Sequence, residues 1–145
     1  MPTRIEAAQP DLELPLAEDK ICWVIVKARE FEAKDVLTDP GDSSNPTDDA
    51  MRGVLEDGGD PVAEELQRFI AALTDEERAA LVAMAWLGRG DGGLEDWPDL
   101  LDTASREADR PAGPYLLGMP LLADHLEAAL DSFGGSCAEV SFDHL

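Results

Sequence analysis

The sequence has 145 residues, the ordinary size of one domain, and 44% of them are hydrophobic, enough for a substantial core. Eleven Lys and Arg residues stand against 32 Asp and Glu residues, which gives a net charge of −21. No basic stripe is present to meet phosphates and no apolar run is long enough to span a membrane, so we expect neither direct nucleic-acid binding nor membrane insertion.

The N-terminal segment, residues 1–13, contains Pro2 and Pro10 and has no apolar periodicity, so we expect a flexible tail. It also lacks the apolar stretch of a signal peptide, and we therefore expect a cytoplasmic protein. Residues 16–34 are predicted to form a helix that is apolar nearly all round its middle, as in a central core helix. The run ICWVIV is rich in β-branched residues, so a strand is the alternative, but the charged pattern that follows favours the helix.

The two cysteines, Cys22 and Cys137, lie far apart in the sequence. Cys22 stands in the apolar run and is expected to be a small buried residue. The spacing indicates neither a disulfide framework nor a zinc site, so we expect both cysteines to be reduced. Cys137 and His144 form a nominal thiol–imidazole pair, but both belong to the predicted C-terminal tail, residues 136–145, where we do not expect catalysis.

An acidic segment spans residues 35–65, where ten acidic residues are opposed only by Arg52, a net charge of −9. The simplest interpretation is a solvated face that keeps the protein soluble. We predict an acidic loop over about residues 35–60. Ser44 or Asn45 can cap a helix within it, with Pro46 in the first turn and an end near Glu56.

Cap signals define the central helices. Asp60 is expected to cap a helix opened by Pro61. Thr74 and Glu77 form the capping-box pattern T-x-x-E, which predicts a helix directly behind it. That helix carries the run from Leu81 to Leu87, and Gly88 is the expected left-handed residue at its C-terminal end. The GRGDGG run that follows is predicted to be a turn.

Two further helices are expected in the last third of the chain. One begins near Trp97, with Pro98 in its first turn, and ends before the sequence RPAGP, residues 110–114. The other has apolar residues at helical spacing, with Gly118 and Pro120 interrupting its beginning and Gly134 ending it. Its apolar residues are Leu122, Leu126, Ala129, Leu130 and Phe133. The predicted fold is all-α, a compact bundle of about six helices with short loops, forming a single domain over residues 14–135.

Four segments carry a family resemblance, and they span about residues 21–134: ICWVIVKAREFEAKD, SNPTDDAM, LVAMAWLGRGD and YLLGMPLLADHLEAALDSFG. The combination of WLGRGD with a following LLGMPLLADHLE is unusual. On these residues the sequence resembles an uncharacterised bacterial family, domain of unknown function 3775. The resemblance implies a bacterial, cytosolic, helical protein, and it brings no activity, cofactor or catalytic residue.

The most distinctive local motif runs from Trp86 to Asp91. Arg89 follows the predicted helix end, where a cation meets the negative end of the helix dipole, and Asp91 can pair with it or cap the next turn. Two interpretations are open, a structural corner between helices or a recognition loop in which Arg89 binds a carboxylate or phosphate. The corner is the commoner role of such glycine-flanked turns.

Asp124 and His125 lie on the last predicted helix with Glu127 close by, so His125 has the polar neighbours of a ligand or base. The chain has only two histidines and no HExxH spacing, so a surface histidine is the simpler interpretation. The candidate binding residues are Trp86, Arg89, Asp91, Asp124 and His125. No catalytic residue, metal or cofactor is predicted, because nucleotide, calcium and nucleophile-elbow motifs are absent.

These observations favour a non-enzymatic protein–protein interaction domain with an acidic surface. Its partner would be a protein, a basic one or a second copy of this chain. One alternative is an acidic mimic or inhibitor of a nucleic-acid-binding protein. Another is a small ligand-binding or hydrolytic domain built around Arg89, Asp91, Asp124 and His125.

Overall fold

The structure is a computed structural model that describes residues 13–38, 60–107 and 110–138. The helices in these ranges are α1 (Glu18–Thr38), α3 (Pro61–Ala72), α4 (Asp75–Arg89), α5 (Trp97–Arg106), α6 (Ala112–Leu117) and α7 (Leu122–Ser132), with the short 3₁₀ helix η4 (Leu94–Asp96) before α5. The described ranges contain no strand. The predicted all-α fold is therefore confirmed, and the strand alternative for ICWVIV is wrong.

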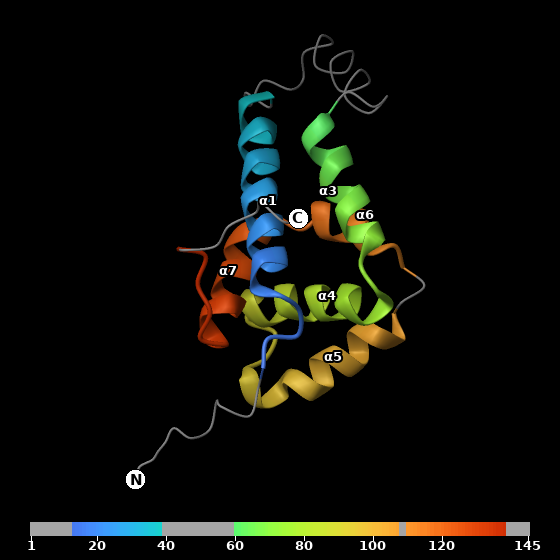
Figure 1. The fold of residues 1–145 in the computed structure, drawn as a ribbon, viewed down its shortest axis with the longest axis vertical. Helices are drawn as coiled ribbons and strands as arrows, with labels where there is room; N and C mark the ends of the chain where they lie inside the picture. Colours follow the sequence, from blue (N-terminus) through green and yellow to red (C-terminus); the bar gives the residue numbers. More distant parts are fainter. Residues whose placement is uncertain (1–12, 39–59, 108–109, 139–145) are drawn as a thin grey trace.

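Helix α4 forms the centre of the bundle, as Figure 1 shows. It packs against α5, α6 and α7, while α1 packs against α7 and α3, and α3 also contacts α6. In the view of Figure 1, α1 and α3 run along the long axis, α4 crosses below them, and α5 lies below α4. None of the described helices is both long enough and apolar enough to cross a membrane.

The core is built mainly from small and aliphatic residues. Eight of the fifteen residues of α4 are buried, from Ala79 to Leu87. In α1, Ile21, Cys22 and Val24 have no exposed surface, so the prediction of a core helix is confirmed for most of its circumference. Val26 is the exception to this prediction, because 38% of its surface is exposed. One narrow face of α1 therefore meets solvent.

The predicted N-terminal caps are present. The Thr74 hydroxyl accepts a hydrogen bond from the Glu77 backbone N–H, and the Glu77 carboxylate accepts one from the Thr74 N–H, both at 3.0 Å. The Asp60 carboxylate accepts hydrogen bonds from the backbone N–H groups of Val62 at 3.0 Å and Ala63 at 3.4 Å. Both α3 and α4 thus begin where local side-chain chemistry predicts.

The predicted end of α4 is wrong by two residues. Gly90 is the left-handed residue, with φ of +103°, and Gly88 lies inside the helix. A Cβ atom on Gly88 would lie 1.7 Å from the backbone carbonyl oxygen of His125. Gly88 is therefore required for the close approach of α4 to α7, a role that depends on tertiary packing and leaves no local signal.

The RPAGP sequence is predicted to end the helix that begins near Trp97, and α5 does end before it, but a further helix, α6, begins inside it at Ala112. Pro114 falls in the first turn of α6, where a proline removes no helical hydrogen bond. Residues 118–121 separate α6 from α7, which confirms the interruption predicted at Gly118 and Pro120. Gly134 follows α7 with φ of +87°, also as predicted. The helix predicted over Pro46–Glu56 lies outside the described residues.

The expectation of two reduced cysteines is wrong in this structure. Cys22 and Cys137 form a disulfide, with their Cα atoms 5.6 Å apart. Ala123 and Asp124, at the start of α7, contact Glu32 and Arg29 in the second half of α1. Helix α7 therefore runs antiparallel to α1, and the segment that follows α7 reaches the first half of α1. There the Ser136 N–H donates to the Glu18 carboxylate at 2.8 Å. Cys137 is consequently fixed to the core, not part of a free tail.

Candidate binding site

The corner after α4 is closed by an ion pair between two of the predicted site residues. The Arg89 guanidinium donates to both carboxylate oxygens of Asp91, over 2.7 Å and 3.2 Å. This pairing raises the pKa of Arg89 and lowers the pKa of Asp91. Arg89 and Asp91 therefore neutralise and hydrogen-bond each other, as in a structural corner between helices.

Asp124 and His125 lie in different surroundings, although they are neighbours in sequence. Asp124 accepts a hydrogen bond from Arg29 of α1 at 2.8 Å, and Glu127 contacts the same guanidinium. The backbone of His125 lies against Gly88 near the end of α4, and His125 is the smallest of the causes that lower the pKa of Asp91. The structure thus brings His125 near Arg89 and Asp91, and it engages Asp124 in a separate link to α1.

Trp86 is buried, with 8% of its surface exposed, and it packs within the core. Its indole N–H donates to the hydroxyl of Tyr115 on α6 at 2.7 Å. Tyr115 also contributes to the raised pKa of Arg89. Trp86 therefore acts by positioning Tyr115, and Tyr115 connects the predicted corner to a neighbouring cavity.

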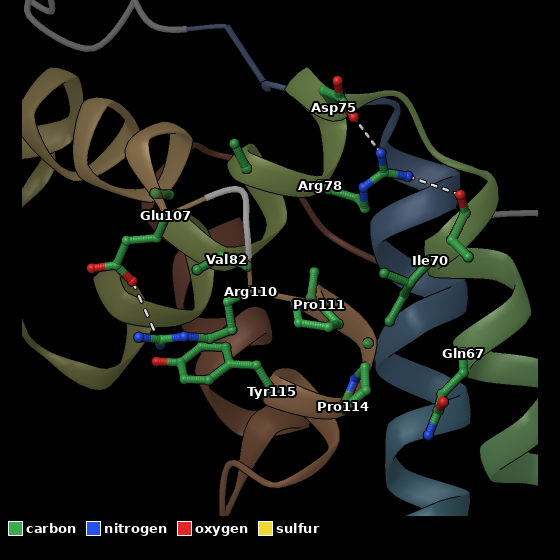
Figure 2. A pocket seen from close by; sticks show the side chains of 15 residues that line it. Gln67, Ile70, Asp75, Arg78, Val82, Glu107, Arg110, Pro111, Pro114 and Tyr115 are labelled. Carbon is green, nitrogen blue, oxygen red and sulfur yellow. Dashed lines mark hydrogen bonds and ion pairs between the residues drawn. The ribbon is translucent and has the colours of Figure 1, made fainter.

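A cavity of about 380 Å³ opens between α3, the first half of α4, the end of α5 and the start of α6 (Figure 2). Its apolar lining includes Ile70, Ala71, Ala79, Val82, Ala104 and Pro114. Three of these six are alanines, which are too small to fill the space between the helices that carry them. The cavity therefore follows from alanines placed where neighbouring helices converge.

Two arginines border the cavity in different ways. Arg78 donates to the backbone carbonyls of Ala71 and Leu73 and pairs with Asp75, so it holds the end of α3 against α4. Arg110 lies over the ring of Tyr115, with its guanidinium carbon 5.0 Å from the ring centroid. Its guanidinium is 3.5 Å from the carboxylate of Glu107. Figure 2 shows this stacked arrangement at the rim.

Sequence reasoning did not single out Tyr115, Arg110 or Glu107. A signal existed for Tyr115, which is the one tyrosine of the chain and carries a hydroxyl that needs a partner when its ring is partly buried. Arg110 stood in a stretch interpreted only as a helix breaker. Their contact depends on the turn between α5 and α6, which no local pattern specifies.

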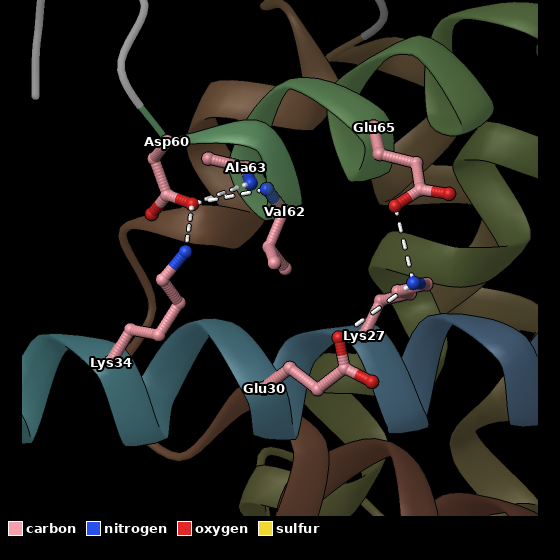
Figure 3. Close-up of polar contacts among 7 residues, drawn as sticks. All are labelled: Lys27, Glu30, Lys34, Asp60, Val62, Ala63 and Glu65. Atoms are coloured by element: carbon pink, nitrogen blue, oxygen red, sulfur yellow. Dashed lines mark hydrogen bonds and ion pairs between the residues drawn. The ribbon is translucent and has the colours of Figure 1, made fainter.

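Residues 60–65, the C-terminal end of the acidic segment, form ion pairs with α1 (Figure 3). Lys34 contacts Asp60 at 3.3 Å, and Lys27 contacts Glu65 at 3.1 Å. The Glu65 carboxylate is the main cause of the raised pKa of Lys27. Lys27 also lies 5.6 Å from the ring centroid of Trp23. These acidic groups stabilise the α1–α3 contact in addition to contributing negative charge.

Within the described parts of the chain, no group of three or more His, Cys, Asp or Glu side chains is arranged to hold a metal ion. The geometry that remains is a cavity with an apolar lining, a fixed aromatic ring at its rim, and charged groups beside that ring.

A family model described as a protein of unknown function, DUF3775, matches residues 63–134. The chain belongs to this family. The matched segment runs from the first turn of α3 to just beyond α7, so it contains every residue that lines the cavity and leaves out α1 and both cysteines. The resembling segment at residues 21–35 therefore lies outside the match. Comparisons with curated proteins and with solved structures give no significant match.

Proposed function

We propose that this chain is a non-enzymatic protein-binding domain whose cavity receives an apolar side chain of a partner protein. The cavity carries the proposal. Its volume of about 380 Å³ is near the lower end of ligand pockets, which span roughly 300–1,000 Å³. A space of this size with an apolar lining suits one anchoring side chain, and buried anchors of this kind dominate the affinity of protein interfaces.

The contacts of the predicted polar residues support a binding role over catalysis. Arg89 and Asp91 are bonded to each other, and Asp124 is bonded to Arg29. A nucleophile or general base needs its reactive atom directed toward a substrate. These contacts therefore favour the structural corner over the ligand-binding or hydrolytic alternative centred on these residues and His125.

The charge of the molecule supports a basic partner. A net charge of −21 attracts positively charged proteins and speeds their association. The pairing of Asp60 and Glu65 with lysines of α1 weighs against an acidic mimic built on that end of the segment. Self-association is disfavoured by the same charge.

The bacterial origin and the cytoplasmic location stay predictions. The disulfide weighs against a cytoplasmic location, because such bonds persist in oxidising compartments.

The test is a selection of binders from a displayed random-peptide library, using the disulfide-bonded protein as bait. Ala71 and Ala72 are adjacent on α3, and only Ala71 lines the cavity. We expect the enriched peptides to share an apolar anchor residue. They should be retained by Ala72→Phe and lost on Ala71→Phe, which fills the cavity. Peptides without a shared apolar anchor, or peptides retained equally by both variants, would refute the proposal.

A further inference from the structure

The rim of the cavity holds a cation that belongs to the chain itself. The Arg110 guanidinium stacks on the ring of Tyr115, and the carboxylate of Glu107 lies beside it. An aromatic face with an adjacent carboxylate is the arrangement in which proteins bind arginine and lysine side chains. In the free protein, Arg110 takes the place that such a side chain would occupy.

We propose that Tyr115 and Glu107 form a cation subsite for an Arg or Lys side chain of a basic partner protein, which displaces Arg110 when it binds. The proposal rests on the protein-binding function above and adds the chemistry of the partner. The apolar anchor enters the cavity, and the neighbouring basic residue takes the subsite.

The ring of Tyr115 is positioned before any partner arrives. Its hydroxyl accepts a hydrogen bond from the indole of Trp86, which is buried in α4. Fixing the ring in advance removes the entropy cost of ordering it on binding. The subsite therefore presents a rigid aromatic face at the mouth of the cavity.

Arg110 is held weakly enough to be displaced. Its nearest nitrogen is 3.5 Å from Glu107, and the two side chains are 53% and 42% exposed. Exposed ion pairs of this kind contribute little to stability. Arg78 differs, because it is only 29% exposed and donates to two backbone carbonyls as well as contacting Asp75. Arg110 is thus the exchangeable cation of the two.

The negative net charge of the molecule favours a cation at this subsite over a carboxylate. A pocket bordered by two arginines could instead bind a carboxylate, with Arg110 as a direct ligand. A net charge of −21 repels such an anion and attracts a cation. The two cases predict opposite effects of removing Arg110, since one vacates the subsite and the other destroys it.

The experiment uses four defined probes, each titrated into the ¹⁵N-labelled protein. Acetyl-Leu-Arg-amide carries both the anchor and the cation, and acetyl-Leu-citrulline-amide is its neutral isostere. Acetyl-Ala-Arg-amide lacks the anchor, and acetyl-Leu-Glu-amide reverses the charge. The indole N–H signal of Trp86 reports on Tyr115, because the two groups share a hydrogen bond.

We expect Arg110→Ala to bind acetyl-Leu-Arg-amide three- to tenfold more tightly than the unchanged protein, with no gain for the citrulline probe. Arg110→Met, which keeps the aliphatic stem, should show the same gain if the alanine variant folds poorly. Glu107→Gln should weaken the arginine probe several-fold. The control is Arg106→Ala, which removes the same charge from an exposed position paired with Asp102, and should have no comparable effect.

Weaker binding of the arginine probe to Arg110→Ala would overturn the subsite, as would a gain no larger than that of Arg106→Ala, or preferential binding of the glutamate probe. The function itself is read separately, from the advantage of the leucine probe over the alanine probe and its loss in Ala71→Phe. An arginine-over-citrulline preference without a leucine advantage would leave the subsite standing and refute the anchoring cavity. Tighter binding of the leucine probe without a preference for arginine over citrulline would support the anchoring cavity and refute the subsite.

Discussion

Gly88 and Gly90 are separated by one residue and have different roles. Gly88 lets the backbone of α7 approach α4, whereas Gly90 adopts the left-handed conformation that ends the helix. We predict that Gly88→Ala lowers the free energy of unfolding by about 3 kcal/mol, since the new methyl group overlaps a backbone carbonyl. Gly90→Ala should cost about 1 kcal/mol, because only the left-handed backbone is strained. Urea unfolding measures both values, and equal losses would contradict the assigned roles.

Glu77 links the cap of α4 to α1. Its pKa is lowered, first by the hydrogen bond from the Thr74 N–H and then by Lys20 at 2.9 Å. A group whose pKa is lower in the folded state adds stability above its unfolded pKa of 4.5, and this stability is lost as the pH falls below that value.

We therefore predict that the stability of the protein decreases below about pH 4.5 and that Glu77→Gln flattens part of this decrease. At neutral pH the substitution should cost only about 0.5–1 kcal/mol, because the Gln oxygen can still accept the hydrogen bond from the Thr74 N–H and only the ion pair with Lys20 is lost. Denaturant unfolding between pH 2.5 and 7 tests the prediction, with the exposed neighbour variant Glu76→Gln as the control. An unchanged acid slope in Glu77→Gln would rule out this contribution.

At the scale of the helices, sequence reasoning succeeded where the signal is local. The caps at Asp60 and Thr74 and the termination at Gly134 each depend on a few neighbouring residues, and all are present. It failed where the signal comes from packing. Gly88 was misassigned, and the cavity was missed, because alanines from separate helices define an empty space only after those helices meet.

The candidate site shows the same division. Pairing of Arg89 with Asp91 was foreseen as one possibility from their spacing, and it is present. Trp86 was predicted to be a binding residue, whereas its side chain is buried in the core. Its partner Tyr115 is 29 positions away, on α6, which was expected only as the interrupted beginning of the last helix. Long-range contacts of this kind leave no pattern in a single sequence.

The hydrogen bond between Trp86 and Tyr115 joins α4 to α6. We predict that Tyr115→Phe lowers the free energy of unfolding by about 1 kcal/mol, the usual value for one buried hydrogen bond. The Trp86 indole proton should exchange with solvent faster, because it loses its acceptor. Urea unfolding and hydrogen exchange measure the two effects. An indole proton as protected as in the unchanged protein would show that the bond does not hold α6 in place.

At the scale of the molecule, α1 connects separate parts of an acidic protein. Its basic residues pair with acidic residues of other parts of the fold: Lys20 with Glu77, Lys27 with Glu65, Arg29 with Asp124 and Lys34 with Asp60. Each pair is partly exposed and contributes little alone. Together they place positive charge between acidic surfaces that would otherwise repel one another. The family-matched segment thus acquires from α1 both a packing surface and counter-charges.

The disulfide encloses most of the chain, since Cys22 and Cys137 are 115 positions apart. Closing so long a loop reduces the entropy of the unfolded state, an effect of about 2–4 kcal/mol in typical proteins. We predict that Cys137→Ala, or reduction of the unchanged protein, lowers the unfolding free energy by this amount. Reductant should not alter the stability of Cys137→Ala. Two free thiols under oxidising conditions would show that the bond does not form.

The central claim is that the cavity between α3, α4, α5 and α6 binds a side chain of a partner. Its most direct measurement is the affinity of one selected peptide for Ala71→Phe and for Ala72→Phe, determined by calorimetry on variants of equal stability. The account predicts an affinity at least tenfold lower for Ala71→Phe, whose new ring occupies the cavity, and an unchanged affinity for Ala72→Phe. Affinities within twofold of each other would show that the peptide binds elsewhere and that the cavity is not the binding site.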